Sequence, residues 1–210
     1  MKAETIAEKR GKLARNALQL NARSRALDLP YLMLMTDDRL SADWVAAAGS
    51  LPAGAAVIVR HRDDTKRELL ARTLSPVCVS RRVMLVIADD LKLAMRMRAD
   101  GVHVPQARHK LITEARLRNP NWIVTASAHD HMSVAAASRA GADAAVVSPL
   151  FETRSHPGER ALGVTRFQSL VRCSRIPAYA LGGINADNVE RLRDVSIAGI
   201  AMINGWFDGG

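Results

Sequence analysis

The sequence lacks the features that mark secreted and membrane proteins. Its two cysteines, Cys78 and Cys173, form no CxxC pair, so neither a disulfide framework nor a thiol redox motif is expected. No apolar run approaches the roughly 18 residues that a membrane-spanning helix needs, and residues 1–29 have no continuous apolar centre like that of a secretion signal. With 48% hydrophobic residues, 13 glycines and 8 prolines, the composition is neither disordered nor low in complexity. We therefore expect one folded domain in the cytoplasm, with no membrane partner.

Positive charge is in excess and is concentrated near the N-terminus. The chain has 30 Lys and Arg residues against 21 Asp and Glu residues, which gives a net charge of +9. Residues 2–25 contribute more than half of this excess, through Lys2, Lys9, Arg10, Lys12, Arg15, Arg23 and Arg25 against Glu4 and Glu8. The segment lacks the aromatic side chains on which single-stranded nucleic acids stack, so a nucleic-acid partner is not expected. We interpret residues 1–29 as a solvated basic helical extension.

The rest of the chain repeats a strand and a helix. Continuous apolar runs, typical of strands covered on both faces, occur at 31–35, 56–60, 83–87, 101–104, 122–127, 144–148, 178–181 and 199–203. Segments with helical apolar spacing lie between them at 43–50, 66–74, 91–98, 110–118, 132–140, 165–173 and 187–193. This alternation predicts parallel strands joined by right-handed crossovers. Eight units of about 26 residues favour a single (β/α)₈ TIM barrel over residues 30–206, with a doubly wound open sheet as the alternative.

Glycine-rich turns follow the last two predicted strands. Gly182 and Gly183 come after the seventh strand, and Asn204 and Gly205 end the eighth. Paired glycines let the backbone approach a phosphate closely, and a helix starting near Asp187 would add its free N–H groups and dipole. Barrels of this class often bind phosphate at this position. The sequence predicts a phosphate site here, and a simple tight turn is the alternative.

Two arginines leave the second predicted strand together. In an extended segment Arg60 and Arg62 point the same way, so both planar guanidinium groups are able to meet one phosphate. The alternative is a solvated charge cluster neutralised by Asp63 and Asp64.

Acidic pairs and two histidines complete the candidate site. Magnesium is usually held by one or two carboxylates and by substrate oxygens, so one aspartate from each of two strand ends, such as Asp37 and Asp89, would be needed. A turn at these positions is the alternative.

His129 and His103 lie at or near strand ends and are candidates for general acid or base. The alternatives are a capping role for His129 and a buried, hydrogen-bonded imidazole for His103. No histidine spacing of the HxxxH kind indicates zinc.

These turns, in this order, resemble the thiamine phosphate synthase and TenI-type thiazole tautomerase family. The resemblance extends from about Tyr31 to Trp206. It rests on the motifs at 31–37, at 99–104 with Gln106, at 127–129, at 140–143, at 148–153 and at 182–184.

The resemblance implies a (β/α)₈ barrel that is commonly dimeric. The synthase joins a hydroxymethylpyrimidine diphosphate to a thiazole phosphate and releases pyrophosphate with the help of magnesium, whereas the tautomerase type binds only the thiazole phosphate and moves a proton. By position, Arg60, Ser127 and Thr153 match phosphate or diphosphate contacts, and Arg62 stands where a lysine is usual. Asp89 matches a magnesium ligand. Gly182 and Gly183 match the turn that holds the thiazole phosphate.

Three departures from the family pattern concern the metal and the diphosphate. Ala88 replaces an asparagine that helps hold the metal, Arg108 stands where a second aspartate ligates magnesium, and His156 replaces a lysine of the loop after the sixth strand. Two like charges 4 Å apart repel by roughly 4 kcal/mol at an effective dielectric constant near 20, so Arg108 disfavours the metal and is suited to hold a phosphate itself.

We therefore predict a divergent enzyme with a degraded magnesium site. It would bind a thiazole phosphate or a similar phosphate ester and act as a TenI-like isomerase, with His129 or His103 moving the proton. The expected cofactor is none, or Mg²⁺ at Asp89. The alternatives are a true thiamine phosphate synthase and a non-catalytic ligand sensor. We expect a homodimer, with the basic extension covering the amino-terminal mouth of the barrel or joining the dimer contact.

Overall fold

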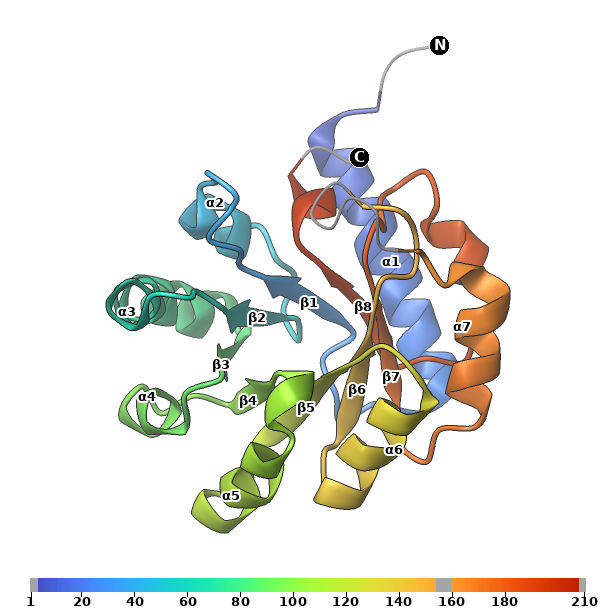
Figure 1. The fold of residues 1–210 in the computed structure, drawn as a ribbon. Coiled ribbons are helices and arrows are strands. Elements are labelled where there is room, and N and C mark those ends of the chain that lie inside the picture. Colours follow the sequence, from blue (N-terminus) through green and yellow to red (C-terminus); the bar gives the residue numbers. More distant parts are fainter. Residues whose placement is uncertain (1–3, 154–159, 208–210) are drawn as a thin grey trace.

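Eight parallel strands form a closed barrel in the computed structural model, which describes residues 4–153 and 160–207 (Figure 1). The strands are β1 (Leu32–Met35), β2 (Ala56–Val59), β3 (Met84–Ala88), β4 (Gly101–Val104), β5 (Ile123–Ala128), β6 (Ala144–Val147), β7 (Ala178–Leu181) and β8 (Gly199–Met202). Each strand pairs with the next in the chain, and β1 also pairs with β8, where Leu32 is in register with Ile200. The predicted (β/α)₈ barrel is confirmed, and the open-sheet alternative is wrong because the first and last strands are hydrogen-bonded.

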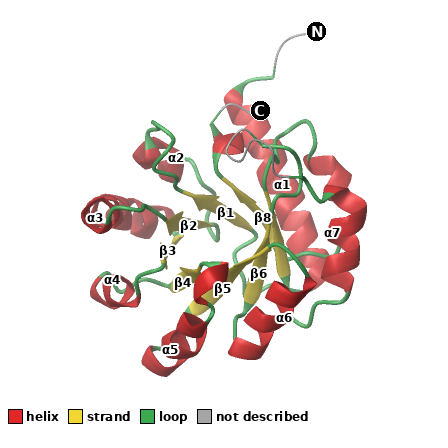
Figure 2. Ribbon diagram, in the orientation of Figure 1, coloured by secondary structure: helices red, strands yellow, loops and turns green. Residues whose placement is uncertain are grey.

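Helices surround the barrel (Figure 2). They are α1 (Ile6–Ser24), α2 (Trp44–Gly49), α3 (Asp64–Arg81), α4 (Leu91–Arg96), α5 (Lys110–Arg118), α6 (His131–Ala140) and α7 (Gly163–Arg172), with 3-10 turns η1 (Gln106–Arg108), η2 (Val189–Leu192) and η3 (Asn204–Trp206). No helix among the described residues is long and apolar enough to cross a membrane.

Two helical segments, α3 and η2, differ from the sequence prediction. Helix α3 was predicted to end at residue 74 but continues through Pro76, because the buried spacing of Ala71, Leu74 and Cys78 holds the same face on the barrel. The helix predicted over 187–193 is only the 3-10 turn η2. The Asn185 side chain accepts hydrogen bonds from the backbone N–H groups of Asp187 and Asn188, and this turn takes up the residues that would start an α-helix.

The basic N-terminal helix packs on the wall of the barrel. Thr5 and Glu8 cap its first turn, and its buried face contacts β8, η2 and β1. At its end the buried Asn21 amide donates to the carbonyl oxygens of Ala26 and Ala198, both at 2.8 Å. Ala26 and Leu29, which follow, pack against the side chains inside the barrel. Helix α1 therefore packs against the barrel wall, and the residues that follow it contact the side chains inside the barrel.

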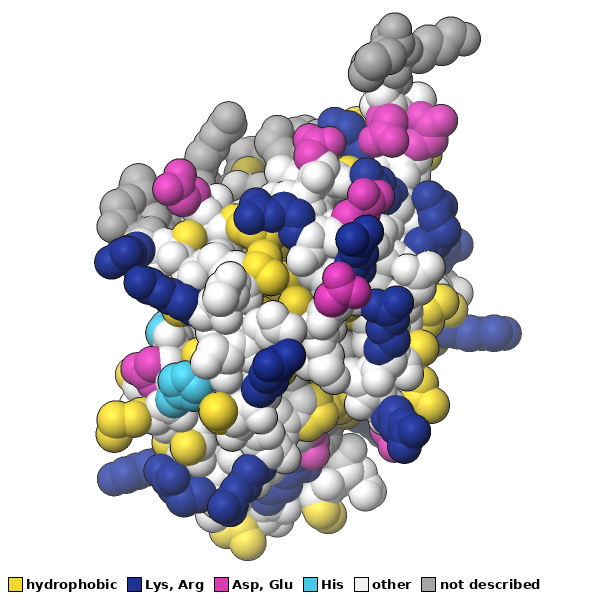
Figure 3. All heavy atoms as spheres, turned by 90° about the vertical axis from the view of Figure 1, so that its right-hand side faces the viewer, with side chains coloured by type: hydrophobic (Ala, Val, Ile, Leu, Met, Phe, Trp, Pro, Cys, Tyr) yellow, Lys and Arg dark blue, Asp and Glu magenta, His cyan; other side chains and the backbone are white. Residues whose placement is uncertain are grey.

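The charge of this face is dispersed. Figure 3 shows the side of the molecule that carries α1 and α7, where basic side chains are spread among acidic, apolar and neutral ones. The outer face of α1 is therefore solvated as predicted, whereas its inner face, with Leu13, Ala17 and Leu20, is buried.

Small side chains inside the barrel leave room near its carboxyl end. One apolar cluster lies between the strands and the helices, and a second, inside the barrel, contains Met33, Tyr179 and several alanines. Tyr179 fills the interior and donates a hydrogen bond from its hydroxyl to the Pro30 carbonyl at 2.6 Å. Ala88 and Ala201 contribute little volume, so a cavity opens above them.

Candidate active site

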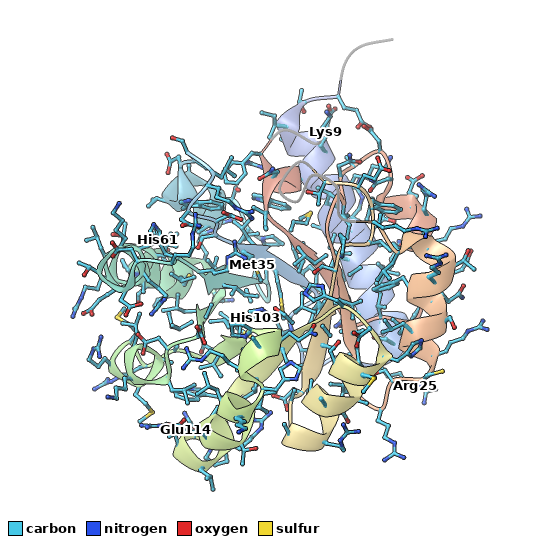
Figure 4. All side chains as sticks on the ribbon, in the orientation of Figure 1. Lys9, Arg25, Met35, His61, His103 and Glu114 are labelled. Carbon is cyan, nitrogen blue, oxygen red and sulfur yellow. The ribbon has the colours of Figure 1, made fainter. Side chains whose placement is uncertain are left out.

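A cavity of about 1010 Å³ lies at the carboxyl ends of the strands. Twelve of the residues singled out from the sequence line it: Arg60, Arg62, Asp89, His103, Arg108, Ser127, His129, Thr153, Gly182, Gly183, Asn204 and Gly205. His156 lies outside the described residues. Figure 4 shows His103 and Met35 near the barrel axis and His61 farther out, beside α3. Turns distant in sequence thus meet at one mouth.

Glycine is required at the turn after β7. Gly182 and Gly183 have φ values of +102° and +64°, and a Cβ on Gly183 would approach the Glu152 carbonyl oxygen to 2.3 Å. The Asn188 amide donates to the Gly183 carbonyl at 2.7 Å and fixes the turn. The N–H groups of Gly183 and Ile184 have no acceptor among the described residues, so they are available to an anion.

One part of the phosphate-site prediction is wrong. The helix expected to begin near Asp187, with its dipole, is absent from the described residues, because η2 is a single 3-10 turn. An anion here would rely on the turn's backbone N–H groups instead.

Arg60 and Arg62 line the cavity, but each is paired separately. The Arg60 Nη2 atom lies 2.8 Å from Asp37 Oδ2, and the Arg62 Nε atom lies 2.6 Å from Asp38 Oδ2. The alternative considered from the sequence, a charge cluster neutralised by Asp63 and Asp64, is wrong. Asp63 caps α3 and Asp64 pairs with Arg67 because both belong to the start of that helix. The true partners come from the end of β1, which lies beside β2 in the barrel.

Asp37 is a buried carboxylate held by two arginines. Arg39 donates to both of its oxygens, from Nε at 2.9 Å and from Nη2 at 2.6 Å, and Arg60 adds the contact given above. Burial alone would raise the pKa of Asp37, but the hydrogen bonds from Arg39 and the charge of Arg60 outweigh it and lower the pKa to about 2. Asp37 is therefore ionised and fully engaged at neutral pH.

The remaining carboxylate of the expected metal site is ion-paired, although its buried Oδ1 accepts no hydrogen bond within the described part of the chain. Arg108 Nη1 lies 2.8 Å from Asp89 Oδ1. Asp37, the other ligand considered, faces Arg39 and Arg60, and no group of three or more His, Cys, Asp or Glu side chains within the described ranges is arranged to hold a metal. The residues present do not fit a magnesium site. A guanidinium already supplies positive charge beside Asp89.

His103 is a neutral imidazole inside the barrel. Its ring nitrogens lie 2.9 Å from Thr125 Oγ1 and 2.8 Å from Ser127 Oγ. Burial, together with the charge of Arg60, lowers the pKa of His103 to about 4. At pH 7 only one ring nitrogen carries a proton, so His103 is not an imidazolium and is poorly suited as a general acid.

His129 has the geometry of a base. Its Nδ1 atom lies 2.7 Å from the Ser148 carbonyl oxygen, which only accepts hydrogen bonds, so Nδ1 carries the proton. The lone pair is then on Nε2, and the exposed ring lines the cavity. Of the two histidines, His129 is better placed to take a proton from a ligand.

Two arginines of the mouth were missed by sequence reasoning. Arg39 follows Asp37 by two residues, a local signal for their pairing. Arg67 is buried in the first turn of α3 and donates to the His61 carbonyl and to Asp64 and Asp90, so it ties the turns after β2 and β3 together. Its spacing of three from Asp64 was the available signal.

Comparison with known proteins agrees with the barrel and its turns. Residues 32–206 match the sequence pattern described as thiamine monophosphate synthase. The chain belongs to this family. The family resemblance predicted from the motifs is thus confirmed.

Relatives of the synthase family cover most of the chain. It is 34% identical over 151 residues to the putative thiamine-phosphate synthase 2 of Aquifex aeolicus, covering 70% of this chain and 81% of the relative. It is 30% identical over 185 residues to the thiamine-phosphate synthase of Bacillus velezensis, covering 84% and 82%. The structure of the thiamine phosphate pyrophosphorylase from Pyrococcus furiosus superposes with a TM-score of 0.70 at 25% identity, covering 82% of this chain and 85% of that one. The predicted enzyme class agrees with these transferase names, which favour the synthase alternative over the isomerase.

Proposed function

We propose that this synthase-family protein joins a hydroxymethylpyrimidine diphosphate to a thiazole phosphate. The observation that carries the proposal is the family match over the whole barrel, with its phosphate-binding turn and arginines on one cavity. A C–N bond forms between the pyrimidine methylene carbon and the thiazole nitrogen. The C–O bond to the diphosphate breaks, and pyrophosphate leaves with the electron pair.

The cavity offers separate places for the two anionic groups. The N–H groups of Gly183 and Ile184, with Asn204 and Gly205 beside them, form the thiazole phosphate end. We assign Arg60, Arg62, Ser127 and Thr153, which also line the cavity, to the diphosphate end, and His156 by its sequence position.

In this proposal the Arg108 guanidinium supplies the positive charge that a metal ion would otherwise supply. Its guanidinium lies beside Asp89, is about half exposed, and lines the cavity. A planar guanidinium donates two parallel hydrogen bonds to phosphate oxygens. It would therefore stabilise the negative charge that develops on the departing pyrophosphate.

A second candidate function is isomerisation of a thiazole phosphate by proton transfer. The observation that favours it is the fixed tautomer of His129, which presents Nε2 as the base. This reaction needs neither the second substrate nor a divalent ion, and the Asp89–Arg108 pair is compatible with it. His103 is the less suitable base because burial lowers its pKa to about 4.

Product analysis separates these functions. The purified chain is incubated with both substrates, and separately with the thiazole phosphate alone. Thiamine phosphate and pyrophosphate from the first mixture support the proposal, whereas their absence at high enzyme concentration contradicts it. Exchange of the thiazole ring proton in the second mixture, reduced about 100-fold or more in His129→Gln but not in His131→Gln, supports isomerisation. His131 is an exposed histidine on α6 and so makes a matched control. Ligand binding with neither reaction would indicate a sensor.

The division into residues 1–29 and 30–206, the homodimer and the cytoplasmic location stay predictions. Sedimentation of the purified chain tests the dimer.

A further inference from the structure

Arg60 is held at both its backbone and its side chain by the two residues that follow β1. Thr36 Oγ1 donates to the Arg60 carbonyl oxygen and accepts from the Arg60 N–H, both at 2.8 Å. Asp37 Oδ2 accepts from Arg60 Nη2, also at 2.8 Å. Thr36 and Asp37 are 1% and 2% exposed, whereas the Arg60 side chain is 37% exposed, so a partly exposed arginine is held from its buried side.

The position of Arg60 makes such restraint useful. Its side chain borders the main cavity and also a smaller cavity of about 340 Å³ between β1, β2 and α3, lined by apolar side chains such as Trp44 and Leu70. Without a restraint, the Arg60 side chain would be able to turn toward either cavity. Asp37 borders only the smaller cavity and fixes one edge of the guanidinium at the boundary.

The charge of the cluster also matters. Asp37 carries one negative charge and contacts two guanidinium groups, Arg39 and Arg60, which both line the main cavity. The three side chains together have a net charge of +1. A single carboxylate therefore orders two cations without neutralising them, which leaves the cluster attractive to an anion.

We propose that Thr36 and Asp37 are positioning residues that hold Arg60 in the orientation that meets the anionic end of the ligand. The inference rests on the proposed function to the extent that Arg60 must contact a phosphate or diphosphate. Neither positioning residue needs to touch the ligand. Their effect is to reduce the ordering that Arg60 would otherwise undergo on binding.

A charge-matched comparison distinguishes positioning from simple electrostatics. Inorganic pyrophosphate is titrated calorimetrically into the full chain and into R60A, D37N and E114Q. Both D37N and E114Q remove one negative charge. D37N deprives Arg39 and Arg60 of their shared carboxylate, whereas E114Q deprives only Arg118, on the outer helix α5 (Figure 4). If charge alone mattered, D37N would bind pyrophosphate as tightly as wild type or more tightly. Positioning predicts that D37N binds at least about fivefold more weakly, with E114Q within about twofold of wild type.

Threonine variants provide a test without a charge change. T36V removes the hydrogen bonds to Arg60 and is expected to weaken pyrophosphate binding about threefold or more, whereas T36S retains the hydroxyl and should match wild type. If D37N does not fold, this pair decides. Wild-type affinity in folded T36V, or in folded D37N, overturns the inference.

The arginine variant separates the two proposals. R60A is expected to lose about tenfold or more in affinity. If R60A binds pyrophosphate as wild type does, Arg60 has no ligand role, and both its assignment in the proposed function and the positioning inference are wrong. If R60A binds weakly while D37N and T36V bind normally, only the positioning inference fails.

Discussion

Arg108 and Asp89 form an ion pair inside the cavity, with Nη1 2.8 Å from Oδ1. The two residues come from the turns after β4 and β3, which are neighbouring strands. Asp89 has a left-handed backbone, with φ at +60°, and its carboxylate already has a cationic partner. A divalent ion bound to Asp89 would have to displace the Arg108 guanidinium or be repelled by its charge. In this structure the positive charge beside Asp89 is that of the Arg108 guanidinium.

Opposite substitutions in this pair should change anion affinity in opposite directions. R108Q removes a cation from the cavity and is expected to weaken pyrophosphate binding roughly tenfold, in keeping with a charge-assisted hydrogen bond at a half-exposed position. D89N frees the Arg108 guanidinium and should strengthen binding. Calorimetry with R118Q as the control, an arginine on the outer helix α5, provides the measurement. Weaker binding in D89N would indicate that Asp89 serves the ligand through a bound cation instead.

The neutral state of His103 should make stability depend on pH. The unfolded chain takes up a proton at this residue near pH 6.5, whereas the folded chain does so only near pH 4. Between these values the unfolded state binds more protons, so stability is full above pH 6.5 and falls as the pH drops to 4. The loss of unfolding free energy is about 3 kcal/mol at most.

Urea unfolding at pH 7, 5.5 and 4.5 measures this dependence. H103Q should show a flatter profile than wild type over this range, because glutamine does not titrate. H131Q, at an exposed histidine, should keep the wild-type profile. Equal slopes in H103Q and wild type would contradict the neutral, buried assignment.

Two glycines with similar φ angles but different surroundings allow a matched test of the proposed phosphate turn. Gly163 and Gly183 have φ values of +69° and +64°. A Cβ at Gly163 meets nothing within 4 Å, whereas one at Gly183 would collide with the Glu152 carbonyl oxygen and the Phe151 Cβ. G163A should cost only the left-handed strain of about 1–2 kcal/mol. G183A should cost clearly more and should also weaken phosphate binding.

Thermal and urea unfolding of both variants, with phosphate titration of each, checks this expectation. Similar stability losses would show that the loop at Glu152 yields easily. Unchanged phosphate affinity in a folded G183A would place the anion elsewhere in the cavity.

The sequence predicted the barrel well because its strands are continuous apolar runs buried on both faces. The ranges 101–104 and 178–181 coincide with β4 and β7, and the closing β1–β8 pair follows from the count of eight. Helix ends were less predictable. Apolar spacing predicted a helix only to residue 74, but the buried face of α3 continues beyond it through Pro76. The side chains of Asn185 and Asn188 form a turn where apolar spacing predicted a helix.

The site was predictable as a set of residues but not as a set of partners. Strand ends converge in any barrel, so Arg60, Asp89, Arg108 and His129 were expected at one mouth. Which of these side chains form ion pairs depends on where the side chains at the ends of neighbouring strands point. Arg60 therefore meets Asp37, 23 residues earlier, rather than the nearby Asp63.

The most direct test of the guanidinium in place of a metal is the rate of the joining reaction with and without a chelator. Purified protein is treated with EDTA and desalted, and the formation of thiamine phosphate from both substrates is followed with EDTA present and again with added Mg²⁺. If Arg108 supplies the positive charge, wild type has the same rate in both conditions and R108Q shows a large loss in both. A wild-type rate that EDTA abolishes and Mg²⁺ restores would contradict this role of Arg108.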